Sequence, residues 1–140
     1  MKTLLTGAAG FIGHYVAKLL AERGDEVIAI DNINDYYPVS LKYDRLKDLG
    51  IDSDTFYSND PITSTKYPNL KFIKMELRDS GELMHLFDQE QFTHVCHLAA
   101  QAGVRYSLKN PQAYMESNMV GFLNLLEAVR HNPLTHFVYA

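Results

Sequence analysis

The chain has 140 residues, 46% of them hydrophobic, which is enough for one compact core and too few for two full domains. Thirteen Lys and Arg stand against 17 Asp and Glu, so the formal net charge is −4 and an electrostatic grip on nucleic acid is not indicated. The single cysteine, Cys96, excludes an internal disulfide and a multi-cysteine metal site, and it fits a reducing cytoplasm. No stretch has the length of a membrane span, and glycines interrupt the first apolar run where a secretory signal would need continuity.

Short apolar runs alternate along the chain with segments of helical periodicity. Strands are expected at residues 2–6, 27–30, 70–74, 93–98 and 135–139. Helices are expected at residues 11–23, 41–49, 80–89 and 111–131. Asp79 with Glu82 resembles a capping box, and Asn110-Pro111 supplies an N-cap and a proline at the first helical position. Residues 51–69 are polar and rich in turn formers, and we interpret them as an insertion. The alternation predicts βαβ units and a parallel sheet of the α/β class.

A glycine-rich turn joins the first expected strand to the first expected helix. Gly7, Gly10 and Gly13 form a GxxGxxG pattern there. A tight turn needs a residue free of Cβ constraints, a pyrophosphate needs close approach to the backbone, and a helix N-terminus offers unpaired N–H groups to an anion. The pattern therefore predicts a dinucleotide site, and the alternative is a compact turn without a ligand. A nucleotide P-loop is excluded because no Gly-Lys-Ser/Thr follows.

Asp31 ends the second expected strand, where a carboxylate accepts hydrogen bonds from the ribose hydroxyls of a bound dinucleotide. A carboxylate there repels a 2′-phosphate, and no Lys or Arg lies between Asp31 and Tyr37 to neutralise one. The sequence therefore favours NAD over NADP. Taken alone, Asp31 is equally well explained as a turn former or a helix cap.

Four stretches of the chain resemble a known family. They are TGAAGFIG, DNINDYYPVSLKYDRL, HLAAQAGVRYSLKNPQAYMESN and GFLNLLEAVR. They resemble the extended short-chain dehydrogenase/reductase proteins, and within them the NAD-dependent nucleotide-sugar 4-epimerases that act on UDP-glucuronate. The resemblance covers essentially the whole chain. It implies a Rossmann-type, doubly wound, three-layer α/β fold that stops after its fifth strand, so that residues 1–140 form an incomplete NAD-binding domain without a C-terminal substrate domain.

The resemblance also implies where a cofactor would lie. The NAD diphosphate would be held by Gly7, Gly10, Phe11, Ile12 and Gly13. The adenosine ribose and its phosphate neighbour would be held by Asp31, Asn32 and Asn34. The ribose and nicotinamide side would be lined by Leu98, Ala99, Ala100 and Gln101. Asn118 matches a family asparagine beside the cofactor, although the position also suits an exposed helix residue.

Two further positions are implied by the same resemblance. Glu76, followed by Leu77, stands where the family usually has an aspartate that contacts the adenine amino group, so this sequence keeps the charge and adds a methylene. Val104 and Arg105 fall in a loop that would face the sugar nucleotide, where the planar guanidinium of Arg105 suits a carboxylate or phosphate. The alternative for Arg105 is a surface arginine on a mobile loop.

The family reaction transiently oxidises C4 of the sugar through a 4-keto intermediate, and it needs a Ser or Thr and a Tyr/Lys pair. Those positions are expected beyond Ala140, so we expect no catalytic residue in this chain and no activity from it alone. The six histidines show no metal-ligand spacing, and no metal site is expected. A UDP-sugar substrate, pairing as homodimers, and a role in polysaccharide precursor supply are implied for the full-length protein. The alternatives are a fragment of a nucleotide-sugar 4,6-dehydratase and a natural NAD-binding module without catalytic function.

Overall fold

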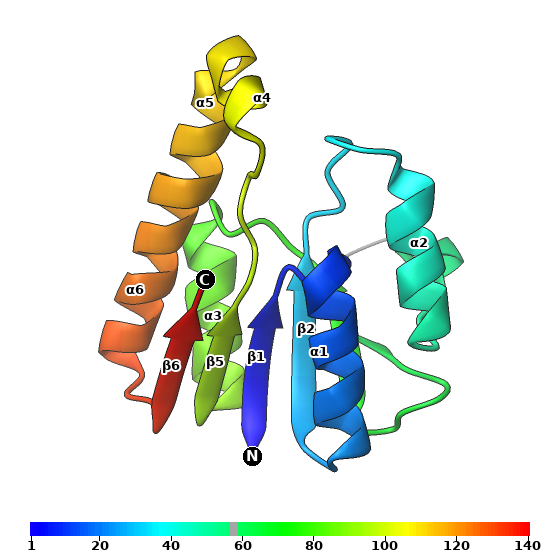
Figure 1. Cartoon of the computed structure of the whole chain (residues 1–140). Coiled ribbons are helices and arrows are strands. Elements are labelled where there is room, and N and C mark those ends of the chain that lie inside the picture. Colours follow the sequence, from blue (N-terminus) through cyan, green and yellow to red (C-terminus); the bar gives the residue numbers. More distant parts are fainter. Residues whose placement is uncertain (57–58) are drawn as a thin grey trace.

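A computed structural model describes residues 1–56 and 59–140 and shows a six-stranded sheet covered by helices (Figure 1). The strands are β1 (Lys2–Thr6), β2 (Glu26–Asp31), β3 (Ile62–Thr63), β4 (Leu70–Lys74), β5 (His94–His97) and β6 (His136–Tyr139). The helices are α1 (Phe11–Glu22), α2 (Val39–Asp48), α3 (Ser80–Glu90), α4 (Val104–Lys109), α5 (Pro111–Tyr114) and α6 (Phe122–His131). A short 3₁₀ turn, η1 (Ser53–Thr55), follows α2, and a π-helical segment, η2 (Met115–Gly121), joins α5 to α6.

The sheet order is β3-β4-β2-β1-β5-β6, and every pair is parallel except β3 with β4. The chain starts at β1 in the middle of the sheet, moves outward through β2 to β4, and returns to the other side of β1 at β5. This arrangement confirms the predicted parallel, doubly wound α/β fold. It also places a topological switch point between the neighbouring strands β1 and β5, because the chain leaves β1 toward β2 on one side and leaves β5 toward β6 on the other. Open α/β sheets bind their ligands at such a point.

The core lies on both faces of the sheet, as the unbroken apolar runs of the strands require. Leu4 and Leu5 of β1 are fully buried in two different clusters, because successive side chains of a strand point to opposite faces. Leu5 packs in the cluster that includes Ala17 of α1, whereas Leu4 packs in the cluster that includes Leu83 of α3 and Leu125 of α6. Figure 1 shows α3 and α6 on one face of the sheet and α1 on the other. The molecule therefore has the predicted three layers.

Three features differ from the sequence-based expectation. Residues 51–69 are not only turns, because β3 adds a sixth, antiparallel edge strand through the pairing of Ile62 with Phe72; residues 57–58 of that stretch lie outside the described residues. Residues 104–109 form helix α4, which is too short to show an apolar period. The expected helix over residues 111–131 changes to a π-helix in η2, and an apolar stripe does not distinguish one helical winding from the other.

The two predicted helix starts are confirmed. The carboxylate of Asp79 accepts a hydrogen bond from the amide of Glu82 at 3.0 Å, and the side chain of Asn110 accepts one from the amide of Ala113 at 3.3 Å.

In residues 1–56 and 59–140, no helix combines the length and the apolar character that crossing a bilayer requires.

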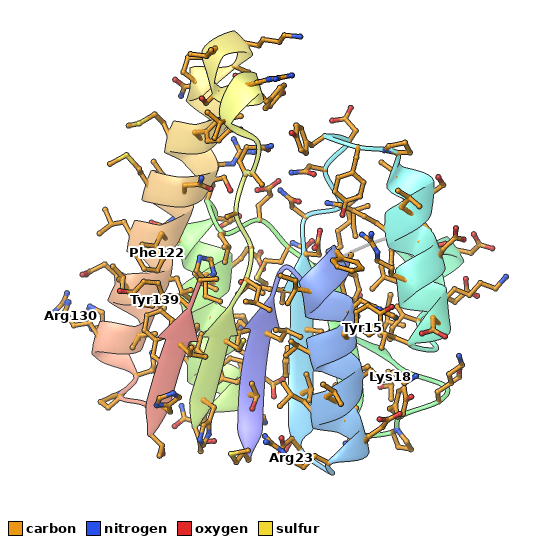
Figure 2. The ribbon with its side chains drawn as sticks, in the orientation of Figure 1. Tyr15, Lys18, Arg23, Phe122, Arg130 and Tyr139 are labelled. Carbon is orange, nitrogen blue, oxygen red and sulfur yellow. The ribbon has the colours of Figure 1, made fainter. Side chains whose placement is uncertain are left out.

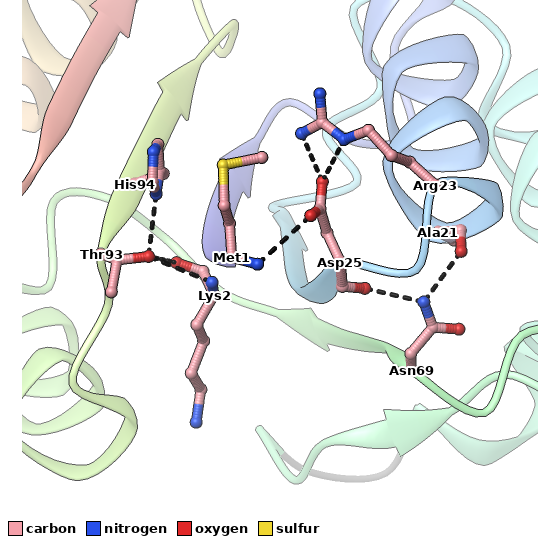
Figure 3. A network of polar contacts seen from close by, with 8 residues as sticks. All are labelled: Met1, Lys2, Ala21, Arg23, Asp25, Asn69, Thr93 and His94. Atoms are coloured by element: carbon pink, nitrogen blue, oxygen red, sulfur yellow. Dashed lines mark hydrogen bonds and ion pairs between the residues drawn. The ribbon is translucent and has the colours of Figure 1, made fainter.

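The amino ends of β1 and β2 are joined by a polar network, shown in Figure 3. Asp25 is 5% exposed, and its carboxylate accepts hydrogen bonds from Nε of Arg23 at 2.8 Å and from the Met1 ammonium at 3.3 Å. Nδ2 of Asn69 donates to the backbone oxygens of Ala21 at 2.9 Å and Asp25 at 2.7 Å. Burial acts to raise the pKa of Asp25, but the hydrogen bonds from Arg23 and the ammonium hold this pKa below its ordinary value of 3.8.

Replacing Asp25 with asparagine is expected to lower the free energy of unfolding at pH 7 by about 1.5 kcal/mol, because the charge-assisted hydrogen bonds from Arg23 and the Met1 ammonium lose their anion. A carboxyl with a depressed pKa in the folded state stabilises the protein above pH 3.8, and this contribution is lost as the pH falls through the folded-state pKa. Urea unfolding of both proteins at pH 7, 5 and 3.5 should therefore show a difference that shrinks at the lowest pH. The exposed Asp44→Asn variant is the control.

Candidate functional site

A cleft of about 350 Å³ opens at the carboxyl ends of β1, β2, β4 and β5. Its walls include every predicted cofactor residue except Asn118, namely Gly7, Gly10, Phe11, Ile12, Gly13, Asp31, Asn32, Asn34, Glu76, Leu77, Leu98, Ala99, Ala100 and Gln101. These residues come from four separate stretches of sequence. The fold therefore brings them to one edge of the sheet, which is the switch point described above.

The glycine turn forms the floor of the cleft where β1 meets α1. Gly7 has φ +73°, and a Cβ at this position would lie 2.7 Å from the amide nitrogen of Ala99. A Cβ on Gly13 would overlap the carbonyl of Gly7, so this glycine lets α1 pack directly against the turn. The amide of His14 bonds to the carbonyl of Gly10, and Gly10 caps α1 without a side-chain hydrogen bond. The N–H groups of the first helical turn are thus left for a ligand, which suits a diphosphate.

The carboxylate of Asp31 is surrounded by donors from three segments. It accepts hydrogen bonds from the amide of Ala9 at 3.1 Å, from the amide of Ile33 at 2.9 Å and from Nζ of Lys42 at 3.2 Å. Nζ of Lys42 also donates to the side-chain oxygen of Asn34 at 3.0 Å. Asp31 therefore ties the glycine turn, the loop after β2 and helix α2 together at the cleft wall.

Lys42 is a residue of the site that the sequence interpretation missed. No Lys or Arg between Asp31 and Tyr37 is available to neutralise a 2′-phosphate, but the structure brings a lysine from α2 to the carboxylate of Asp31. Both side chains are almost completely buried, 6% and 7% exposed, so the pair is a part of the cleft wall and not a surface ion pair. The only sequence signal was the polar residue on an otherwise core-facing position of a short helix.

The loop after β2 carries local backbone strain. Ile33 has φ +55°, a left-handed conformation that is unfavourable for a β-branched residue. The hydrogen bond from its amide to Asp31 and the bond from the amide of Asn34 to the side chain of Asn32, at 3.1 Å, hold this conformation. Strained backbone conformations of this kind are concentrated at ligand sites. Here the residues on either side of Ile33, Asn32 and Asn34, both line the cleft.

The β5 side of the cleft is organised by Thr6 and His97. The hydroxyl of Thr6 accepts hydrogen bonds from the amides of Leu98, at 3.2 Å, and Ala99, at 3.1 Å. Its single proton is then left for Nδ1 of His97, 2.7 Å away, so this ring is the neutral tautomer protonated at Nε2. The ring of Phe122 stacks on His97 at 5.3 Å and 15°. The ring centres of Phe122 and Tyr139 lie 5.2 Å apart. Figure 2 labels these two residues, which lie side by side.

Burial holds the pKa of His97 below its ordinary value of 6.5. The unfolded chain therefore takes up a proton at a higher pH than the folded protein does. The contribution of the neutral His97 to the free energy of unfolding is complete above pH 6.5. It declines as the pH falls below 6.5, until the folded-state pKa of His97 is reached.

We expect the free energy of unfolding to decline below pH 6.5 by up to about 1.4 kcal/mol per pH unit from this residue alone. Asparagine in place of His97 retains an acceptor for Thr6 and does not titrate, so the variant should show a flatter profile in chemical unfolding between pH 7.5 and 5.5. The exposed His85→Asn variant should keep the wild-type slope. Identical slopes for His97→Asn and wild type would contradict the assignment.

Asn118 is not among the residues that line the cleft, and its place beside the cofactor stays a prediction. Its side-chain oxygen accepts from the amide of Gln101 at 2.8 Å, and its Nδ2 donates to the carbonyl of Gln101 at 3.0 Å. Asn118 is therefore not a freely exposed helix residue either. It fixes the backbone of Gln101, which does line the cleft.

The end of the cleft beyond β4 is formed by Glu76 and Leu77. Nε of Arg78 lies 3.4 Å from the carboxylate of Glu76, and Arg78 also forms an ion pair with Glu116 of η2. Gly121 of η2 allows a close approach here, because a Cβ on it would lie 3.1 Å from Cβ of Leu77. Glu76 is thus held at the cleft wall by a partner from its own loop, and its side chain remains 43% exposed.

Val104 and Arg105 are not among the residues that line the cleft. They begin helix α4 instead of lying in a loop, and both are exposed, Val104 to 85%. The wall that faces α4 is aromatic and was not predicted. Tyr36 and Tyr37 line the cleft, and the ring of Tyr36 packs against that of Tyr106 in α4 at 4.8 Å.

Comparisons with known proteins agree with this arrangement. A family model described as GDP-mannose 4,6 dehydratase matches residues 4–140. Protein CapI of Staphylococcus aureus is 46% identical over 140 residues, which are 100% of this chain and 37% of that protein. UDP-glucuronate 4-epimerase 6 of Arabidopsis thaliana is 43% identical over 141 residues, 100% of this chain and 27% of that protein. The chain thus spans little more than a third of the first relative and less of the second.

Solved structures show the same fold. A variant of UDP-glucuronic acid 4-epimerase from Bacillus cereus, in complex with NAD and a fluorinated UDP-glucuronic acid, superposes with a TM-score of 0.78 at 29% identity, over 99% of this chain and 39% of that one. UDP-glucose 4-epimerase from Thermus thermophilus, in complex with NAD, superposes with a TM-score of 0.70 at 32% identity, over 96% of this chain and 35% of that one.

The sheet order, the glycine turn and the cleft at the switch point define a Rossmann-type α/β protein. The chain belongs to the family described as GDP-mannose 4,6 dehydratase, and its similarity to the UDP-glucuronate 4-epimerases confirms the resemblance seen in the sequence.

Proposed function

We propose that this chain forms the NAD-binding part of a nucleotide-sugar 4-epimerase that acts on UDP-hexuronates. The observation that carries the proposal is the single cleft into which the glycine turn, Asp31 and residues 98–101 all converge. Support for the substrate class comes from the relatives, since proteins named UDP-glucuronate 4-epimerases align with all or nearly all of this chain at 41–43% identity.

The residues of the cleft fit NAD in charge, shape and hydrogen bonding. The first turn of α1 would hold the diphosphate, and the positions of Gly7 and Gly13 leave the backbone bare where a side chain would overlap it. The carboxylate of Asp31 would accept a hydrogen bond from a ribose hydroxyl, and the carboxylate of Glu76 would accept one from the adenine amino group. The residues after β5, held by Thr6 and Asn118, would form the wall beside the nicotinamide.

NAD would supply the acceptor and donor of a hydride at C4 of the sugar, which is what inverts that centre through a 4-keto intermediate. The part played by this chain is to position the cofactor and to exclude water from one side of it. We propose that the residues that move the proton and that select the sugar lie outside these 140 residues, since the relatives are much longer.

The second candidate function is a nucleotide-sugar 4,6-dehydratase, and the description of the matching family model favours it. The two reactions differ in the mass of the product. Incubating the protein that carries this sequence and NAD with UDP-glucuronate and, separately, with GDP-mannose, which keeps a hydroxyl at C6, followed by mass spectrometry and chromatography, separates them. An epimerase converts UDP-glucuronate into an isomer of unchanged mass with the mobility of UDP-galacturonate, whereas a dehydratase converts GDP-mannose into a product lighter by one water. NAD binding without either product would support a cofactor-binding module.

A further inference from the structure

The proposed function leaves the buried lysine of the cleft wall unexplained. Nζ of Lys42 lies 3.2 Å from Asp31, 3.0 Å from Asn34 and 5.4 Å from the centre of the Tyr37 ring. Its side chain is 6% exposed, yet Lys42 lines the cleft at the end where the adenosine ribose would lie. Burying an ammonium costs folding free energy unless an anion or several acceptors compensate its charge. In this site Asp31 is that anion.

Most hydrogen-bond acceptor sites of the Asp31 carboxylate are occupied by donors of the protein itself. A carboxylate offers about four lone-pair sites. The amides of Ala9 and Ile33 and the ammonium of Lys42 already occupy three of them. Asp31 can therefore accept a hydroxyl group, but its negative charge is balanced within the wall. The repulsion that a carboxylate normally exerts on a 2′-phosphate is correspondingly reduced here.

A second cation lies on the same helix face. Nη1 of Arg45 donates to the carbonyl of Ala9 at 3.1 Å and to the hydroxyl of Tyr37 at 2.9 Å. Its guanidinium carbon lies 6.0 Å from the centre of the Phe11 ring. These neutral acceptors fix Arg45 beside the glycine turn, whereas Lys42 is the cation that contacts the carboxylate at the ribose position. The contributions of the two cations are therefore separable by substitution.

We propose that Lys42 determines how strongly this site distinguishes NAD from NADP. In the wild-type protein the ammonium of Lys42 is paired with Asp31, and the carboxylate of Asp31 accepts a hydrogen bond from a ribose whose two hydroxyls are free. When position 31 is neutral, Lys42 becomes a buried cation without its counter-charge, and a 2′-phosphate supplies that charge through charge-assisted hydrogen bonds. This inference rests on the proposed function, because it requires the cofactor to bind in this cleft.

The test is a double-mutant cycle with the purified protein, read by calorimetric titration of NAD and of NADP. The proteins are wild type, Asp31→Asn, Lys42→Met and the double variant, with Asp31→Ser as a second neutral replacement. We expect Asp31→Asn and Asp31→Ser to bind NADP at least about tenfold more tightly than wild type, and the double variant to lose this gain. Lys42→Met alone should raise the ratio of the NADP to the NAD dissociation constant, because Asp31 is then an uncompensated anion.

Three outcomes would overturn the inference. Folded Asp31 variants without a gain for NADP would show that Lys42 does not receive a 2′-phosphate. A gain that persists in the double variant would assign the effect to another group, such as Arg45. An unchanged ratio in Lys42→Met would reduce Lys42 to a structural support of Asp31, which affects both cofactors equally. Lys47→Met, an exposed cation on the same helix, is the matched control and should leave the ratio unchanged.

The cycle also separates this inference from the proposed function. If folded wild-type protein binds neither cofactor, the proposed function is wrong. If wild type binds NAD but the variants show no gain that depends on Lys42, only the role of Lys42 is wrong. Thermal unfolding of each variant shows whether the proteins compared are folded.

Discussion

Alanine at position 13 is expected to lower the free energy of unfolding by about 3 kcal/mol and to abolish NAD binding. The reason is that a Cβ on Gly13 would overlap the carbonyl of Gly7 and lie 3.0 Å from Cα of Ala8. Both neighbours are backbone atoms of the turn, so they cannot move aside as a flexible side chain would. The change therefore pushes α1 away from the turn and displaces the N–H groups that would hold the diphosphate.

The control for this prediction is Gly81→Ala in the first turn of α3. A Cβ there would lie 3.6 Å from its nearest neighbour, Oδ1 of Asp79, which is ordinary contact. Alanine is a better helix former than glycine, so this variant should be as stable as wild type or slightly more stable. Chemical unfolding and calorimetric titration of the two alanine variants together test the geometry of the turn. Equal stability of both variants would contradict it.

The second large effect is expected for Asp31→Ala. Removing this carboxylate leaves Lys42 as a buried charge without its anion, which costs about 3–5 kcal/mol of folding free energy. It also frees the amides of Ala9 and Ile33 from the acceptor that holds the strained loop. NAD affinity should fall at least about tenfold, because the ribose loses its acceptor and the loop loses its anchor.

The double variant Asp31→Ala, Lys42→Met should recover part of this stability, because it removes the unpaired charge along with its partner. Glu127→Ala is the control, since Glu127 forms an exposed ion pair with Arg130 and such solvent-screened pairs add little to stability. Urea unfolding of the four proteins provides the comparison. A double variant that is no more stable than Asp31→Ala would argue that Lys42 is not a buried charge in the folded protein.

The fold was largely predictable because its main elements are local patterns. The apolar runs of β1, β2, β4, β5 and β6 and the apolar stripes of the longer helices indicate their structure without tertiary information. The edge strand β3 was not predictable, since two residues carry no period and their pairing with Lys71 and Phe72 is set by the tertiary fold. The π-helical winding of η2 is likewise invisible in an apolar stripe.

The same division holds for the candidate site. The place of the glycine turn and Asp31 in the cleft was predictable, because it follows from their spacing within one βαβ unit. Lys42 was not, because its contact with Asp31 depends on how α2 docks against the loop after β2. The contact of Asn118 with the backbone of Gln101, across 17 positions of sequence, was not predictable for the same reason. Motifs therefore located the cleft, while the residues that hold its walls required the folded structure.

The most direct test of this account is a calorimetric titration of NAD into the purified wild-type protein, with Gly13→Ala and Gly81→Ala alongside. The account predicts saturable one-to-one binding to wild type and to Gly81→Ala, and no binding to Gly13→Ala. Folded wild-type protein that gives no saturable heat with NAD, or equal affinity in all three proteins, would contradict the assignment of the cleft as a dinucleotide site.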